Sequence, residues 1–157
     1  MVPRTKSNID KEKQKHNIIS AAINVYSKKD FSKTTVEEIA RKAGIAKGLI
    51  YYYFKTKEEI LLESLNYIRN QMKEYVDRNT PADIDSFEKI RVRIMNILKF
   101  FSKNQEMFLA FAYQDQIKKL NQTHKENMIE AFTSQIKSQT EQFQDALKDG
   151  LIKSDVD

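Results

Sequence analysis

Residues 34–54, TTVEEIARKAGIAKGLIYYYF, decide the fold of this chain. Thr35 and Glu38 have the spacing of a capping box, in which a hydroxyl and a carboxylate each satisfy a free backbone amide at a helix start. Gly44 follows about two turns later, and glycine adopts the left-handed conformation of a helix end at the least cost. The stretch therefore predicts a helix over 36–43, a tight turn and a helix over 46–53. Two helices joined in this way form a helix-turn-helix, whose second helix can enter the major groove of DNA.

The helix over 46–53 carries side chains suited to binding phosphate. Hydroxyl and ammonium groups are the usual phosphate donors, and they gather within 11 residues as Lys47, Tyr51, Tyr52, Tyr53, Lys55 and Lys57. The alternative is that the three tyrosines and Phe54 are simply core, but four consecutive helical residues sweep about 300° and cannot all face one interior. The interpretation as a helix-turn-helix leaves the core to Val36, Ile39, Ala40, Ile45, Ile50 and Phe54. Gly48, which has no side chain, lets the backbone approach a base closely.

Apolar residues recur at helical spacing along the rest of the chain, which predicts an all-α fold. A first helix over about 11–28 carries the stripe Ile18, Ala21, Ala22, Val25 and Tyr26. Thr56 with Glu59 and Asp85 with Glu88 are two more capping boxes. They start a fourth helix over about 57–78 and a fifth that runs to about Lys103. A sixth segment breaks near 118–122, and a seventh helix over about 123–149 stops at Gly150.

Charge and composition narrow the function. Residues 1–60 carry 13 Lys and Arg against 7 Asp and Glu, whereas residues 61–157 carry 14 against 15. The positive excess therefore lies with the helix-turn-helix, which indicates a polyanion-binding head and a neutral body. The alternative is a solvated lysine-rich surface. The chain has no cysteine and two histidines, which excludes thiol chemistry and predicts no metal or cofactor. With no signal segment or apolar span, we expect a soluble, cytoplasmic protein without membrane contact.

The stretch from Ile18 to Leu61 resembles the DNA-binding domain of the tetracycline-repressor (TetR) family. The family pattern has a TTV-x-x-IA-x-x-AG turn, a KG, an LY-x-[HY]-F recognition helix and a [ST]KEEL start to the fourth helix, and this chain has TTVEEIARKAGIAKGLIYYYF and TKEEIL in register. The resemblance implies a three-helix DNA-binding domain over 11–71, joined through a long fourth helix to a helical ligand-binding and dimerisation bundle over 72–157. It also implies phosphate contacts from Thr35, Lys47, Tyr51, Tyr52, Tyr53 and Lys57, with Gly48 and Leu49 nearest the bases.

Two positions depart from the family pattern, and so does the end of the chain. Ala46 stands where a capping Ser or Thr is usual, and Leu49 replaces a small, often polar residue. An apolar side chain there can meet a thymine methyl group but cannot read a donor or acceptor. The seventh helix is not followed by the two helices that usually build the dimer interface. A truncated chain, a dimer through the sixth and seventh helices, and a monomer with weak DNA affinity all remain open.

We expect a sequence-specific transcriptional regulator that binds a palindromic operator as a homodimer. By the resemblance it is a repressor that a small hydrophobic effector releases from DNA. The candidate pocket residues are Tyr67, Met72, Met95, Phe101, Phe108, Phe111, Met128 and Phe132, and their alternative role is ordinary bundle core. A division or architectural factor without a ligand and a helical interaction protein are the competing functions. No catalytic motif supports an enzyme.

Overall fold

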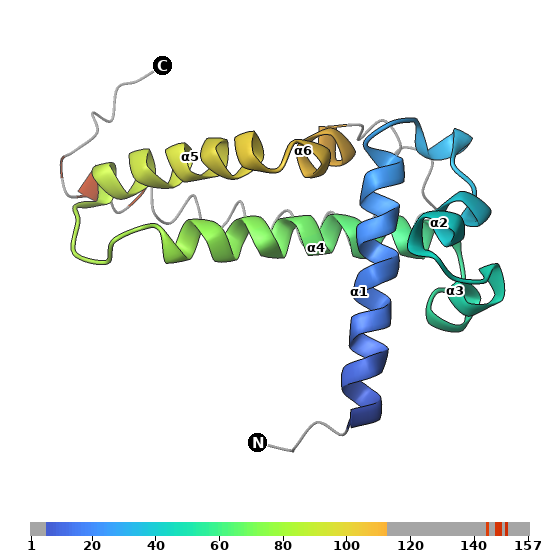
Figure 1. The fold of residues 1–157 in the computed structure, drawn as a ribbon. Helices are drawn as coiled ribbons and strands as arrows, with labels where there is room; N and C mark the ends of the chain where they lie inside the picture. The colour runs from blue at the N-terminus through green and yellow to red at the C-terminus, as the bar shows by residue number, and fades with distance from the viewer. Residues whose placement is uncertain (1–5, 113–143, 145–146, 149, 151–157) are drawn as a thin grey trace. The chain divides into compact units, whose positions relative to one another are not determined.

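The computed structural model describes residues 6–112, 144, 147, 148 and 150. Every regular element in these residues is helical, which confirms the all-α prediction (Figure 1). Their order along the chain is α1 (Lys6–Tyr26), the short 3-10 helix η1 (Phe31–Lys33), α2 (Val36–Ala43), α3 (Lys47–Tyr53), α4 (Lys57–Arg78), α5 (Ser86–Lys103) and α6 (Gln105–Ala112). The predicted break near 118–122 and the seventh helix lie outside the described residues.

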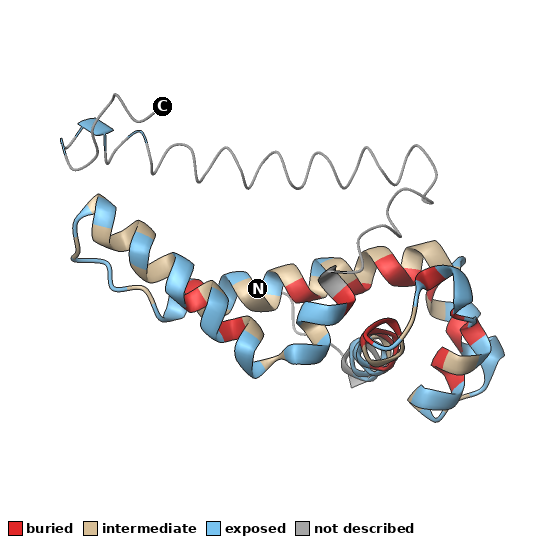
Figure 2. Ribbon diagram, turned by 90° about the horizontal axis from the view of Figure 1, so that it is seen from above, coloured by how far each residue is buried: buried red, intermediate tan, exposed pale blue. Residues whose placement is uncertain are grey.

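The described residues fall into two compact units. The first contains residues 6–69 and 105–112, and the second contains residues 70–104 with the few described residues near the end of the chain. Helix α4 therefore contributes its first half to one unit and its last turns to the other. Most of the fully buried side chains belong to the first unit (Figure 2).

The core of the first unit takes side chains from α1, α2 and α3 and from the first half of α4, where Ile60, Leu61 and Ile68 are buried. The buried residues of α2 are Val36, Ile39 and Ala40, as the apolar spacing predicts. In α3 Ile50 is buried, and Phe54 just beyond it is buried as well. Ile45 in the turn is half-buried.

Helix α1 buries more of its surface than the sequence predicts. Of the stripe residues, Ile18, Ala21, Ala22 and Tyr26 are buried and Val25 is half-buried, and Ile19 and Ile23 are buried as well. Helix α6, from a distant part of the sequence, also packs on α1. The Nδ2 of Asn24 donates a hydrogen bond of 2.6 Å to the Oε1 of Glu106 in α6. A single apolar stripe in the sequence of α1 could not show that α6 packs on this helix in addition to α2.

The second unit contains the end of α4, a short connection and the returning helix α5. The rings of Tyr75 in α4 and Phe100 in α5 lie 5.7 Å apart between centroids. The buried Asn96 of α5 donates from Nδ2 to the backbone oxygen of Asn79, just past the end of α4, at 2.8 Å. Asp85 caps α5 by accepting from an amide, as predicted. The Glu88 carboxylate, which should complete this capping box, instead accepts from Arg91 of the same helix.

Candidate nucleic-acid interface

The helix-turn-helix forms as its sequence predicts. The Thr35 hydroxyl accepts from the Glu38 amide at 3.3 Å, and the Glu38 Oε2 accepts from the Thr35 amide at 2.9 Å, so both halves of the capping box are present. Gly44 ends α2 with φ of +69°, in the left-handed region. The turn that follows leads into α3, whose first residue is Lys47. Ala46 occupies the N-cap of α3 and provides no side-chain hydrogen bond to it.

Helix α3 divides its residues between core and solvent. Ile50 is fully buried, whereas Tyr52 is 66% exposed, Tyr51 46% and Leu49 39%. This confirms that the tyrosine run is not all core. Tyr53 is half-buried, and its ring meets the Tyr52 ring edge-on at 5.1 Å between centroids. The buried side chains hold α3 on the unit, and the exposed ones leave an apolar group and two phenols free for a partner.

Lys47 at the start of α3 forms an ion pair with Glu37 of α2. The hydrogen bond from the Lys47 ammonium lowers the pKa of the Glu37 carboxyl and raises the pKa of Lys47. The ammonium also lies 5.7 Å from the centroid of the Tyr51 ring. Both partners of the pair are exposed, so solvent weakens the interaction and the lysine can exchange the carboxylate for another anion.

The first turn of α2 has a second ion pair, between Glu38 and Lys29. The hydrogen bond from Lys29, together with the Thr35 amide, lowers the pKa of the Glu38 carboxyl to about 2. This carboxylate therefore serves the capping box and an ion pair at once. The Thr35 side chain, which the resemblance assigns to phosphate, is exposed but is engaged in the capping box.

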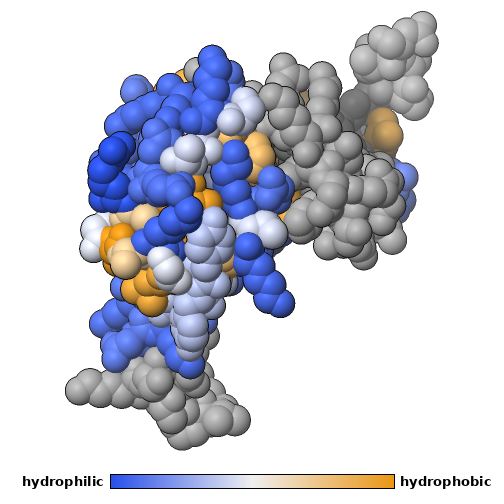
Figure 3. All heavy atoms as spheres, turned by 90° about the vertical axis from the view of Figure 1, so that its right-hand side faces the viewer, coloured by the Kyte–Doolittle hydropathy of each residue, from blue (hydrophilic) through white to orange (hydrophobic). Residues whose placement is uncertain are grey.

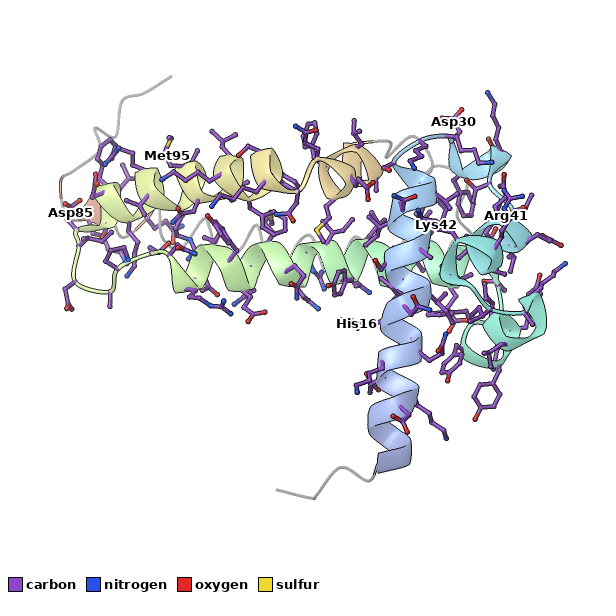
Figure 4. All side chains as sticks on the ribbon, in the orientation of Figure 1. His16, Asp30, Arg41, Lys42, Asp85 and Met95 are labelled. Atoms are coloured by element: carbon purple, nitrogen blue, oxygen red, sulfur yellow. The ribbon has the colours of Figure 1, made fainter. Side chains whose placement is uncertain are left out.

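Two exposed cations that the sequence interpretation did not single out lie in the last turn of α2. Arg41 and Lys42 are exposed, and neither forms an ion pair with a described residue (Figure 4). Figure 3 is seen from the side that carries α2 and α3 in Figure 1, and the surface coloured by hydropathy there is mainly hydrophilic with a small hydrophobic area. The available signal was a pair of adjacent basic residues just before the turn glycine.

Lys57, the first residue of α4, points into the protein. Its ammonium donates to the backbone oxygens of Phe31 and Thr34, each at 2.9 Å. Lys55, two residues earlier, is exposed. The sequence analysis placed both lysines among the candidate phosphate donors. In the structure Lys55 is exposed to solvent, whereas the ammonium of Lys57 is bonded to the backbone.

The candidate pocket residues are spread over both units. Tyr67 is half-buried in the first unit and meets the exposed His16 edge-on at 4.8 Å between ring centroids. Met72 and Phe101 are half-buried in the second unit. Met95 is 44% exposed (Figure 4), and Phe108 is 48% exposed in the first unit. The Phe111 side chain, Met128 and Phe132 lie outside the described residues, so the pocket stays a prediction.

Other kinds of site find little support in the part of the chain that the structure describes. Within it, no group of three or more histidine, aspartate or glutamate side chains is arranged to hold a metal ion. None of the described helices is long and apolar enough to cross a membrane.

A bracing helix, a glycine turn and a second helix that exposes phenols and a cation define the class of helix-turn-helix DNA-binding proteins. Residues 18–64 match the family model described as bacterial regulatory proteins, tetR family. Over these residues the chain has the DNA-binding domain of the tetR family of bacterial regulatory proteins.

Three known proteins illustrate the similarity. The HTH-type transcriptional regulator YhgD of Bacillus subtilis is 29% identical over 87% of this chain and 70% of its own length. The biofilm operon icaADBC negative transcriptional regulator IcaR of Staphylococcus epidermidis is 27% identical over 88% of this chain and 68% of its own length. The crystal structure of the regulator FadR from Bacillus subtilis in complex with stearoyl-CoA superposes with a TM-score of 0.69 and 24% identity, covering 90% of this chain and 75% of that one.

The match to curated relatives does not extend over their whole length. The aligned part covers 19% of one of them and 70% of YhgD. The likeness to FadR, at its low identity, concerns the fold.

Proposed function

We propose that this protein is a transcriptional repressor that binds a palindromic operator as a homodimer and leaves it when a small hydrophobic effector binds. The observation that carries the DNA-binding part is the exposed face of α3, where Leu49, Tyr51 and Tyr52 stand in solvent beside Lys47 while Ile50 anchors the helix. IcaR, a negative regulator by name, supports the direction of control.

The exposed face of α3 suits a mixed contact with phosphates and bases. The phenol hydroxyls of Tyr51, Tyr52 and the half-buried Tyr53 can donate to phosphate. The exposed Thr35 hydroxyl donates to the Glu38 Oε2 at 3.3 Å and would have to leave this carboxylate to contact a phosphate. Gly48 is exposed and presents no side chain, so the backbone can approach the groove floor. Leu49 offers methyl groups, which favours thymine at its contact position.

Lys47 can change its partner from the Glu37 carboxylate to a DNA phosphate, because their ion pair is exposed. A phosphate carries a full negative charge, and it can replace the exposed carboxylate as the partner of Lys47. Arg41 and Lys42, exposed at the end of α2, add positive charge that needs no such exchange. Two such heads in a dimer must stand about 34–36 Å apart to enter successive major grooves.

The test is a binding titration with a fluorescent DNA duplex selected from random sequence by the wild-type chain. We expect Tyr52→Ala and Lys47→Ala each to weaken binding about tenfold or more, and Lys99→Ala to leave it unchanged. Lys99 is the matched control because it is exposed on α5 in the other unit. Lys47→Ala should also flatten the dependence of affinity on salt by about one phosphate per subunit. Equal affinities for all three variants would refute the assignment of α3.

The effector part of the proposal rests on the relatives. FadR was crystallised with stearoyl-CoA, and a fatty acid metabolism regulator of Bacillus subtilis is 38% identical to this chain over 61 residues. We therefore propose a long-chain acyl compound as the first effector to test. Acyl-CoAs of rising chain length should raise the melting temperature and release the selected duplex. DNA binding that no acyl compound alters would favour a regulator without this effector.

A further inference from the structure

Lys57 begins α4, and its ammonium rests on a different segment of the chain. It donates to the backbone oxygens of Phe31 and Thr34, each at 2.9 Å, and lies 4.2 Å from the centroid of the Phe31 ring. Both receiving residues are buried, with Phe31 3% and Thr34 2% exposed. The three contacts come from η1 and the residue after it, so α4 is attached here to the connection between α1 and α2.

The acceptors match what an ammonium group requires. An ammonium has three donors and no acceptor, and hydrogen bonds from a charged donor are about twice as strong as neutral ones. The Phe31 oxygen already accepts from the Thr34 amide at 3.1 Å, and its second lone pair takes Lys57. The ring face adds a cation–π contact. Among the described residues no carboxylate forms an ion pair with Lys57, so the charge is balanced by carbonyl dipoles and the ring.

The position of these contacts in the chain gives them a particular consequence. Thr34 immediately precedes the N-cap of α2, and Lys57 follows the end of α3 by a short connection. The bonds from Lys57 therefore join the two ends of the helix-turn-helix and close a loop that contains both α2 and α3. A connection at both ends restricts how far α3 can tilt on the rest of the unit.

We propose that Lys57 is a positioning residue of the DNA interface, which closes the helix-turn-helix through Phe31 and Thr34 and so sets the angle of α3. Its ammonium acts through these carbonyls and does not contact a phosphate. The inference rests on the proposed DNA binding by α3. It changes the role that the family resemblance implies for this residue.

The test compares Lys57→Met with Lys57→Arg, with Lys99→Met as the control. Methionine keeps much of the aliphatic stem and removes the charge, whereas arginine keeps a charged donor. Affinity for the duplex selected by the wild-type chain is measured at several salt concentrations, at a temperature where circular dichroism shows every variant fully folded. We expect Lys57→Met to bind about tenfold more weakly with the salt dependence of the wild type, and Lys57→Arg to recover part of the loss.

Three results would overturn the proposal. A flatter salt dependence in Lys57→Met would mean that the ammonium contacts a phosphate. Unchanged affinity in the folded variant would mean that Lys57 stabilises the protein without positioning α3. Failure of Lys57→Arg to improve on Lys57→Met would mean that the donor itself is not what matters.

A measurement without DNA separates this inference from the proposed function. Amide hydrogen exchange of residues 36–53 in the free protein should be faster in Lys57→Met than in the wild type and Lys99→Met. If no duplex can be selected, the proposed function fails, and the exchange data still decide whether Lys57 holds the helix-turn-helix closed. Exchange equal to that of the wild type would reject the closure.

Discussion

Tyr26 near the end of α1 provides the sharpest test of the core. Its side chain is 1% exposed, and its ring lies 6.0 Å from the Phe31 ring between centroids. Among the described residues, its buried phenol oxygen has no hydrogen-bond partner. Burial, with a smaller contribution from the Glu58 carboxylate, raises the pKa of Tyr26 far above its ordinary value. The phenol therefore stays neutral in the folded protein at pH values where an exposed tyrosine ionises.

The substitution Tyr26→Phe removes only the phenol oxygen, and its effect on stability depends on pH. At pH 8 the phenol is neutral in both states, and relief of a buried unpaired hydroxyl is worth about 1 kcal/mol in favour of the variant. Above pH 10 the unfolded wild type releases a proton that the folded protein retains, so rising pH favours unfolding. For an unfolded pKa near 10 this costs the wild type about 1.4 kcal/mol more at pH 11. The variant has no such group at this position, so its advantage should widen by that amount.

The assay is urea unfolding followed by circular dichroism at equal protein concentration, at pH 8 and at several values up to pH 11. The two proteins differ only at position 26, so the difference between their free energies of unfolding isolates the contribution of Tyr26. A variant less stable than the wild type at pH 8 would show that the phenol is hydrogen-bonded. A difference that stays constant up to pH 11 would refute the claim that the folded core excludes the phenolate.

Two further predictions concern the helix-turn-helix. Gly44→Ala should lower the free energy of unfolding by about 1 kcal/mol, because φ of +69° strains a residue with a Cβ although no other atom lies near it. Gly44→Asn should lose less, and an alanine variant as stable as the wild type would speak against a backbone cause. Lys29→Met should raise the pKa of Glu38 from about 2 toward its ordinary value, measured by carboxyl NMR titration. Since the folded pKa is depressed, the wild-type pair contributes stability at neutral pH that is lost as the pH falls toward 2; an unchanged pKa in the variant would exclude Lys29 as the cause.

Local signals in the sequence predicted the helices well. The capping box at Thr35 and the glycine at position 44 place α2 at Val36–Ala43, and the structure agrees at both ends. The predicted range for α4 also matches, and the Thr56 hydroxyl accepts from the Glu59 amide at 3.1 Å. The other half of the predicted capping box is shifted by one residue, since the Glu59 carboxylate accepts from the Lys55 amide at 2.7 Å. The first helix was less well bounded, since α1 begins at Lys6 and the prediction began near residue 11. Caps act within a few residues of the chain, so they can be recognised without knowing the fold. The start of α1 has no capping-box pair, in which Ser or Thr is followed three residues later by Glu or Gln.

The exposed half of the candidate interface was also within reach of the sequence. Helical geometry alone required some of the run Tyr51–Tyr53 and Phe54 to leave the core. Which residues leave was decided by packing, since Phe54 is buried and Tyr52 is the most exposed. The direction in which α3 faces depends on α1 and α2. The residues of these two helices lie outside the run of aromatic residues, so the run alone does not show which of its members are buried.

The sequence by itself determined the helical class, the helix-turn-helix and the resemblance of this stretch to the TetR family, because these follow from spacing, caps and residue types within short stretches. Only the tertiary structure decided that α6 packs on α1, that Glu37 pairs with Lys47, and that Lys57 turns inward to Phe31 and Thr34. Each of these contacts joins residues 10 or more positions apart. A lysine is an equally good donor to a phosphate, a carboxylate or a backbone carbonyl, so its role is set by which acceptor the fold brings within reach.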